Sequence, residues 1–315
     1  MNIQFIEVKS EIAAGTRGAS LGIDALKIAS INNNSDFFKD YEATEVESVN
    51  EVLFSETPTP NAKYIEQVYL MESRVCEAVE KVAKSSDFPF VLAGDHSTAA
   101  GTIAGIKSAN PDKRLGVIWI DAHTDLHTPY TTPSGNMHGM PLAMVSYIDN
   151  LENQMNEPSV TAVDFWEDIK KIGGEGPKIN LKDIVFIAAR DLEDPEIALL
   201  DKYNIKNFST EEVREKGAEL VVKESLQKLS DCDILYVSFD VDSMDSAISM
   251  GTGTPVPNGL SVEEAIEINK LLVADPKVVS WEIVEVNPTL DEKNTMAENA
   301  LKVMEAVKNE LTKRL

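Results

Sequence analysis

Short, largely apolar runs recur along the chain, and most are followed by polar residues and then by a segment with helical periodicity. Runs of this kind are typical of parallel strands that are buried on both faces. They occupy Ile3–Val8, Phe88–Ala93, Leu115–Ile120, Ile184–Ala189, Ile234–Phe239 and Val278–Val286. Strands that alternate with helices predict an α/β fold with three layers, α/β/α, around a mostly parallel central sheet.

Helices are predicted between these strands. Ser261 and Glu264 have the spacing of a capping box, which predicts that a helix begins there and runs to Val273. The other expected helices lie within residues 21–29, 62–84, 94–109, 142–147, 211–229 and 292–315. Residues 150–183 show no readable pattern. No internal repeat or linker divides the chain, so we expect a single domain over residues 1–315.

The strongly negative net charge of the chain argues against some classes of binding partner. The chain carries 29 Lys and Arg against 53 Asp and Glu, a formal net charge of −24. Nucleic acids and anionic membranes bind basic surfaces, so we expect neither as a partner. The charge suits a cationic substrate, although solubility alone commonly accounts for it. Cys76 and Cys232 form no paired framework, and neither a leader nor a run of about 18 apolar residues is visible, so we expect a cytoplasmic protein.

Acidic residues and a histidine follow the run Leu115–Ile120. Asp121, His123 and Asp125 are alternate residues, and alternate side chains of an extended chain point the same way. If the strand continues past Ile120, the three side chains meet at one point. Two carboxylates and an imidazole form a ligand set for a divalent metal such as manganese, iron or zinc. The competing interpretation is a strand end followed by an acidic, solvated loop.

Three other strands also end in groups that bind metals or transfer protons. His96 follows the second run, and Asp240 and Asp242 follow the fifth. Glu285 lies near the end of the last run. Ligand sites of open α/β sheets lie outside the carboxyl ends of the strands, so we expect these side chains to share one site. The four histidines of the chain all lie in this set of motifs, at positions 96, 123, 127 and 138.

Two imidazoles and four carboxylates are enough to hold two metal ions that share bridging carboxylates. These ligand candidates are His96, Asp121, His123, Asp125, Asp240 and Asp242. A pair of ions lowers the pKa of a shared water, so that hydroxide forms near neutral pH. The carboxylate-rich set favours manganese over zinc. His138 lies between small neighbours in SGNMHG and is a candidate proton shuttle, because imidazole titrates near pH 7.

These motifs resemble those of the ureohydrolases, the arginase and agmatinase superfamily, and are most like those of arginase. They are AGDHS (93–97), DAHTD (121–125), SGNMHGMP (134–141), SFDVDSMD (238–245), GTGTPVPNGL (251–260) and EVNP (285–288). The resemblance covers nearly the whole chain. It implies the arginase-like fold, two Mn²⁺ per subunit and a homotrimer or homohexamer. It also implies a small cationic guanidino substrate, with L-arginine hydrolysed to L-ornithine and urea by a metal-bridging hydroxide.

The resemblance further implies roles for single residues. One manganese ion would take ligands or bridges from His96, Asp121, Asp125 and Asp242, and the other from Asp121, His123, Asp240 and Asp242. The implied catalytic residues are His138 for proton transfer, Glu285 for contact with the guanidinium, and Asp125 at the metal centre. The implied substrate-binding residues are His127, Ser134 and Asn136 for the α-carboxylate, and Glu193 and Glu196 for the α-ammonium.

The chain departs from the arginase pattern at the amino-acid end of the substrate. His127 stands where that pattern has an asparagine, and Glu193 where it has an aspartate. The alternative function is therefore a ureohydrolase for another guanidino or formimino compound: a guanidino acid, agmatine or formiminoglutamate. A non-catalytic metal-binding member is disfavoured, because all six ligands, His138 and Glu285 are present. A nicotinamide-binding fold is disfavoured, because no GxGxxG follows the first strand.

Overall fold

The computed structural model of the protein describes residues 2–39 and 41–314. In this part of the chain one eight-stranded sheet has the order β2-β1-β3-β8-β7-β4-β5-β6, and each neighbouring pair is parallel. Its strands are β1 (Ile3–Val8), β2 (Ala43–Val46), β3 (Phe88–Ala93), β4 (Leu115–Ile120), β5 (Ile184–Ile187), β6 (Lys206–Phe208), β7 (Ile234–Asp240) and β8 (Val278–Val284). The predicted α/β class with a largely parallel sheet is confirmed.

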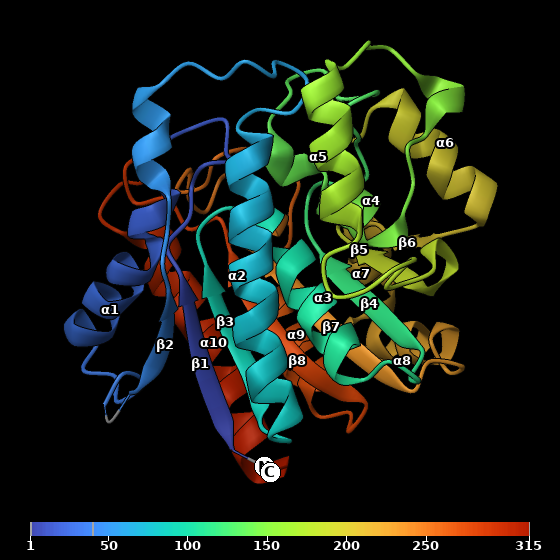
Figure 1. The fold of residues 1–315 in the computed structure, drawn as a ribbon. Coiled ribbons are helices and arrows are strands. Elements are labelled where there is room, and N and C mark those ends of the chain that lie inside the picture. Colours follow the sequence, from blue (N-terminus) through green and yellow to red (C-terminus); the bar gives the residue numbers. More distant parts are fainter. Residues whose placement is uncertain (1, 40, 315) are drawn as a thin grey trace.

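Helices cover both faces of the sheet (Figure 1). One hydrophobic core joins the sheet to α2 (Ile65–Lys84), α3 (Ala99–Ala109), α4 (Pro141–Ser146), α5 (Val160–Lys170) and α6 (Asp194–Tyr203). The other core joins it to α1 (Gly22–Asn32), α7 (Thr210–Lys216), α8 (Ala218–Lys228), α9 (Val262–Val273) and α10 (Thr295–Arg314). None of the helices that the structure describes is both long and apolar enough to cross a membrane.

Strand β4 shows why the sequence produces three layers. All six of its residues are buried. Val117 and Trp119 pack into the core on the α2 side, whereas Ile118 and Ile120 pack into the core on the α10 side. Side chains alternate across a strand, so a strand covered on both faces has to be apolar at every position.

Most predicted elements are present with small shifts at their ends. The bounds of β1, β3 and β4 are as predicted, while β5 and β8 end two residues earlier and β7 gains Asp240. The single helix expected over 211–229 is two helices, α7 and α8, because Gly217 between them has a φ of 78°. The closing helix begins at Thr295, and Leu315, its expected end, lies outside the described residues. The sequence did not predict β2, β6, α5 or α6.

The strand order determines where a ligand can bind. Strands β8 and β7 lie between β3 and β4, so the four strands with polar ends are neighbours at the centre of the sheet. Ligands of open α/β sheets bind outside the carboxyl ends of strands where the strand order reverses. The residues that follow β3, β4, β7 and β8 are therefore brought to one place (Figure 1).

The predicted capping box of α9 is confirmed. The Ser261 hydroxyl accepts the Glu264 N–H at 3.1 Å, and the Glu264 carboxylate accepts the Ser261 N–H at 2.8 Å. We expect Ser261→Ala to lower the free energy of unfolding by about 1 kcal/mol, because a helix-end N–H loses its acceptor. Urea denaturation followed by circular dichroism measures the change. Ser55→Ala, at an exposed position outside any capping box, is the control; an equal loss in both variants would contradict the assigned cap.

Candidate functional site

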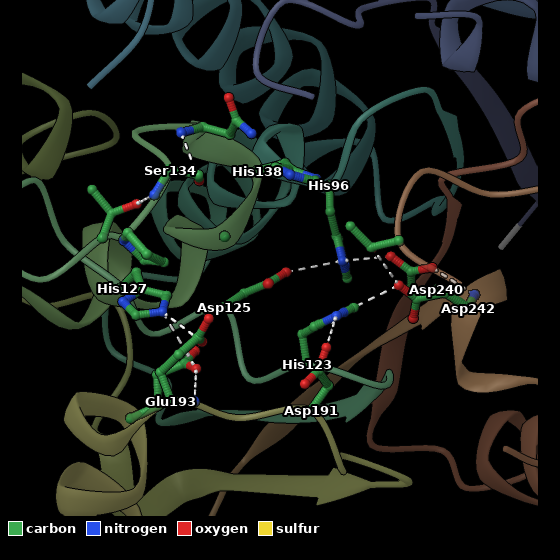
Figure 2. A pocket seen from close by; sticks show the side chains of 16 residues that line it. His96, His123, Asp125, His127, Ser134, His138, Asp191, Glu193, Asp240 and Asp242 are labelled. Carbon is green, nitrogen blue, oxygen red and sulfur yellow. Dashed lines mark hydrogen bonds and ion pairs between the residues drawn. The ribbon is translucent and has the colours of Figure 1, made fainter. Parts of the chain in front are cut away.

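The ends of three central strands, β3, β4 and β7, bring the predicted metal ligands together, and all of these ligands except Asp121 are labelled in Figure 2. His96 opens a short 3₁₀ turn after β3, and Asp121 and His123 follow β4. Asp240 is the last residue of β7, and Asp242 lies in the 3₁₀ turn that follows. Segments that are far apart in the sequence therefore supply side chains to one site.

His96 faces three carboxylates at once. Its Nδ1 lies 3.0 Å from Asp121 Oδ2 and 3.1 Å from one oxygen each of Asp125 and Asp240. One nitrogen cannot form three good hydrogen bonds, and among the described residues neither His96 Nδ1 nor Asp121 Oδ2 has a hydrogen-bond partner. Buried polar atoms without partners are rare in folded proteins. Oxygen and nitrogen atoms that converge in this way are suited to hold a divalent cation.

The imidazole of His96 is fixed by its other contacts. Its Nε2 lies 2.8 Å from Ser238 Oγ. Its ring stacks on Trp119, with the ring centroids 4.1 Å apart and the planes 5° from parallel. Partners of this kind orient a metal-binding histidine and set its tautomer, so that Nδ1 faces the carboxylates.

A second imidazole faces a second pair of carboxylates. His123 Nδ1 lies 3.1 Å from Asp242 Oδ2 and 3.4 Å from Asp121 Oδ1. Asp121 thus directs one oxygen toward each histidine. The resemblance grouped Asp242 with His96, but the carboxylate that approaches His96 from the end of β7 belongs to Asp240. The expected grouping is therefore corrected at this residue.

Strand β4 does not continue past Ile120, so the condition under which alternate side chains would meet at one point is not fulfilled. The strand ends at Ile120, and the chain bends over residues 121–123. Backbone amides hold the carboxylates in place, because the His123 N–H donates to Asp121 at 2.7 Å and the Asp242 N–H donates to Asp240 at 2.8 Å. Asp125 has a φ of 50°, a left-handed conformation that non-glycine residues adopt only where their surroundings impose it.

The cluster carries more negative charge than its own imidazoles can balance. Burial raises the pKa of Asp240 well above its ordinary value, and repulsion from Asp242 and Asp121 adds to the rise. Burial and the charge of Asp121 also raise the pKa of Asp125. For His96, burial opposes protonation, but the contacts with three carboxylates outweigh it and raise the pKa. Buried charges are costly unless they are paired, so the residues fit a centre that divalent cations neutralise.

Arg190, which follows β5, clamps the backbone around Asp242. The guanidinium donates to the carbonyls of Ala188 (3.0 Å), Asp242 (2.9 Å), Val256 (2.9 Å) and Pro257 (3.0 Å). Two longer bonds reach Ser243 and Met244. The sequence did not single out Arg190. Its donors tie the turn that carries Asp242 to the end of β5 and to the 256–257 loop.

His138 and Glu285 form a pair beside the cluster. Their side chains approach to 3.0 Å between His138 Nδ1 and Glu285 Oε1, and the same oxygen accepts the His96 N–H at 3.0 Å. Burial opposes protonation of His138, but the bond to Glu285 outweighs it and raises the pKa. Burial also opposes ionisation of Glu285, yet its bond to His138 lowers the pKa overall. The pair therefore retains a proton on the imidazole and a charge on the carboxylate.

A cavity of about 240 Å³ opens onto the cluster (Figure 2). Eleven of the thirteen predicted site residues line it: His96, His123, Asp125, His127, Ser134, Asn136, His138, Glu193, Glu196, Asp240 and Asp242. The other two, Asp121 and Glu285, lie behind this lining and contact it. Thr132, Asp191 and Thr254 also line the cavity and were missed. Their motifs, TTPSGN, RDLED and GTGTP, were visible in the sequence and could have pointed to them.

A second polar group lies on the wall of the cavity away from the histidine–aspartate cluster. His127 Nε2 lies 2.9 Å from Glu193 Oε2 and 3.5 Å from Glu196 Oε2. The bond to His127 lowers the pKa of Glu193 to about 2, whereas burial raises that of Glu196 to about 7. Burial opposes protonation of His127, but its two glutamates raise the pKa overall. The wall thus holds both a donor and acceptors for a polar head group.

The loop that carries Ser134 and Asn136 is held by a neighbouring loop. Lys63 donates its N–H to the Gly135 carbonyl at 2.8 Å and its ammonium to Asn136 Oδ1 at 2.9 Å. Gly135 has a φ of 74°, and a Cβ there would collide with the Pro60 carbonyl, so only glycine fits. The Asn136 carbonyl oxygen is thus already bound by Lys63, which leaves the amide nitrogen as the group that a substrate could use.

Comparison with known proteins shows a consistent relationship. The family model described as the arginase family matches residues 2–308. The arginase of Bacillus subtilis (strain 168) is 33% identical over 309 residues, which are 97% of this chain and 97% of that protein. A crystal structure of Bacillus subtilis arginase superposes with a TM-score of 0.79 at 32% identity and covers 98% of both chains. Entamoeba histolytica arginase in complex with L-ornithine has a TM-score of 0.82 at 27% identity, with 98% of both chains covered.

The clamp by Arg190 leads to a test of the metal centre. We expect Arg190→Met to weaken the binding of a divalent cation, with Mn²⁺ as the probe, by about 10- to 100-fold, because the turn that holds Asp242 loses its carbonyl contacts. Titration calorimetry on the metal-free protein measures the affinity.

The matched control for Arg190→Met is Arg314→Met. Arg314 also donates to three carbonyls, those of Val273, Asp275 and Val278, but at the amino end of β8. We expect this variant to lose stability and to retain Mn²⁺ affinity. Equal affinities for Mn²⁺ in the two variants would show that Arg190 does not position the centre.

Proposed function

This chain belongs to the arginase family of hydrolases, and from that membership we propose that it hydrolyses L-arginine to L-ornithine and urea. The observation that carries the proposal is the position of Asp121, whose two carboxylate oxygens face two different imidazoles beside the cavity. A carboxylate shared in this way is suited to bridge two metal ions. The cavity also has a polar wall away from this centre, where the head group of an amino acid would bind.

The residues fit two Mn²⁺ ions, which we propose as the cofactors. One ion would be held by His96, Asp121, Asp125 and Asp240, and the other by Asp121, His123 and Asp242. Two groups whose ligand atoms lie close enough together to hold one ion each, His96 with Asp121 and Asp240, and Asp121 with His123 and Asp242, support this division. Bound Mn²⁺ lowers the pKa of water and so supplies a hydroxide nucleophile near neutral pH.

Glu285 would contact the guanidinium. A guanidinium is a planar, resonance-stabilised cation that resists attack by neutral water, and charge-assisted hydrogen bonds to a carboxylate hold it in place. Burial would leave an isolated glutamate protonated, but contact with His138 keeps the pKa of Glu285 below its ordinary value. The carboxylate is therefore available as an anion close to the centre.

His138 would supply the proton that the products require. Hydrolysis breaks the bond between the guanidino carbon and the side-chain nitrogen, which must gain a proton to leave as the ornithine amine. Glu285 engages Nδ1 of His138, so the proton would pass through Nε2. The raised pKa of His138 keeps the ring protonated at a higher pH than an ordinary histidine.

The polar wall supports recognition of an α-amino acid. The Thr132 hydroxyl oxygen accepts N–H groups from Ser134 and Gly135, and the Ser134 hydroxyl oxygen accepts the N–H of Asn136. Both hydroxyl hydrogens can therefore donate to a carboxylate. Glu193 and Glu196 would receive the α-ammonium. The alternative, another guanidino or formimino substrate, is supported by the bond between His127 and Glu193, which engages one of these acceptors.

We also propose a single domain, a homo-oligomer and a cytoplasmic location. One continuous sheet in the described residues supports a single domain over 1–315. The resemblance to the ureohydrolases supports a trimer or hexamer. Two buried cysteines without a disulfide support a reducing compartment.

A substrate panel tests the reaction. We expect the Mn²⁺-loaded protein to bind about two ions per chain and to release urea from L-arginine. Agmatine, 4-guanidinobutyrate and formiminoglutamate complete the panel, and formamide release is followed for the last. Fewer than about one tightly bound ion per chain would refute the two-metal centre. Turnover of formiminoglutamate alone would replace the proposed substrate.

A second test concerns His138. We expect His138→Asn to lower kcat by about 100-fold or more, because the leaving amine loses its proton donor. Mn²⁺ content should stay unchanged, since His138 is not a proposed ligand. Metal analysis of the same preparation separates lost proton transfer from lost metal. Full activity of the variant across the pH range would contradict the role.

A further inference from the structure

The polar wall of the cavity contains a contact between His127 and Glu193, the two residues at which this chain departs from the arginase pattern. His127 Nε2 lies 2.9 Å from Glu193 Oε2. An asparagine at position 127 would be shorter than histidine, and an aspartate at 193 would be one methylene shorter than glutamate. The longer side chains allow the two residues to reach each other across the cavity wall (Figure 2).

The contact is held from both sides of the imidazole. His127 Nδ1 lies 3.2 Å from Thr131 Oγ1, and the His127 N–H donates to the Gly139 carbonyl at 3.0 Å. Only 7% of His127 is exposed. A ring that is buried and bonded through both nitrogens has little freedom to turn away, so Glu193 Oε2 stays engaged.

Glu196 cannot fully replace Glu193 Oε2 as an acceptor for the α-ammonium. Its Oε1 accepts the Thr124 hydroxyl at 2.6 Å, and its Oε2 accepts the Glu193 N–H at 3.1 Å. Both oxygens therefore already have donors within the protein. An α-ammonium would have to share these oxygens or displace the imidazole from Glu193, and either reduces what the ammonium gains on binding.

The carboxylate end of the wall is not affected by this contact. The hydroxyl oxygens of Thr132 and Ser134 accept backbone N–H groups, so their hydrogens remain able to donate. The polar wall therefore binds the α-carboxylate of a substrate more strongly than its α-ammonium.

We propose that the His127–Glu193 contact makes this enzyme accept guanidino carboxylic acids that lack the α-ammonium, in addition to L-arginine. The proposal rests on the proposed hydrolysis of guanidino compounds and names the substrate class of the same site. The diagnostic substrate is 5-guanidinopentanoate, which is L-arginine without its α-amino group. Its kcat/KM is within about tenfold of that for L-arginine, whereas agmatine, which lacks the carboxylate, is the poorer substrate.

Two substitutions of His127 test the cause. His127→Asn is too short to hold Glu193 and frees its oxygen, so it raises the preference for L-arginine over 5-guanidinopentanoate by about tenfold. His127→Gln is long enough to donate to Glu193 and keeps the preference near that of the unmodified protein. The change appears mainly in KM, because the metal centre and His138 are untouched. Mn²⁺ content is measured for each variant, since His127 is close to Asp125 in the chain.

Binding of product analogues separates failure of this inference from failure of the proposed function. Calorimetry on the Mn²⁺-loaded protein compares L-ornithine with 5-aminopentanoate, which differ only in the α-amino group. The inference is supported if the unmodified protein binds the two compounds with similar affinity and His127→Asn binds L-ornithine more tightly than 5-aminopentanoate. This result does not depend on turnover. A preference for the α-amino compounds above about 1,000-fold, or a ratio that His127→Asn leaves unchanged, overturns it. Absence of turnover with every guanidino substrate overturns the proposed function, and the binding ratio still decides the role of His127.

Discussion

The concentration of buried carboxylates at the centre of the sheet is the constraint on which the rest of the site depends. Asp121 lies between two imidazoles, and three further aspartates surround the same point. Such charges repel one another in a dry interior unless the protein holds them rigidly and cations neutralise them. The stacked Trp119, the hydroxyl of Ser238 and the carbonyl clamp of Arg190 supply that rigidity. The binding of cations would therefore also stabilise this region of the fold.

Strain in the backbone follows from the same constraint. Asp125 and Glu285 have φ values of 50° and 66°, although neither is a glycine. Both residues leave a strand and must turn a carboxylate back toward the site within a few positions. Conformations of this kind persist where surrounding contacts impose them, and they are concentrated at functional sites. Here those contacts include the bonds of Glu285 to His138 and to the His96 N–H.

The central strands and the metal-ligating residue types could be predicted from the sequence, because each is visible in a short stretch of consecutive residues. A strand buried on two faces is apolar throughout, and histidines and aspartates at strand ends are visible without a structure. Strands β2 and β6 were missed because they are short, partly polar edge strands. The resemblance grouped Asp242 with His96, but Asp240 is the residue that lies beside His96, because Asp242 belongs to the turn that follows β7. Arg190 and Lys63 act through bonds to distant backbone and side-chain atoms, which residue spacing cannot reveal.

Strand β8 lies between β3 and β7 in the sheet but is synthesised after both, so the site cannot be complete until β8 has been made. Glu285 follows β8 and contacts His96, which lies 189 residues earlier. Contacts between such distant segments form late, because the chain between them must first be ordered. A ribosome-bound chain that already contains the six proposed metal ligands still lacks the strand that completes the centre of its sheet. In newly made protein, the cluster and its cavity are therefore complete only after β8 has been synthesised and has paired with its neighbours.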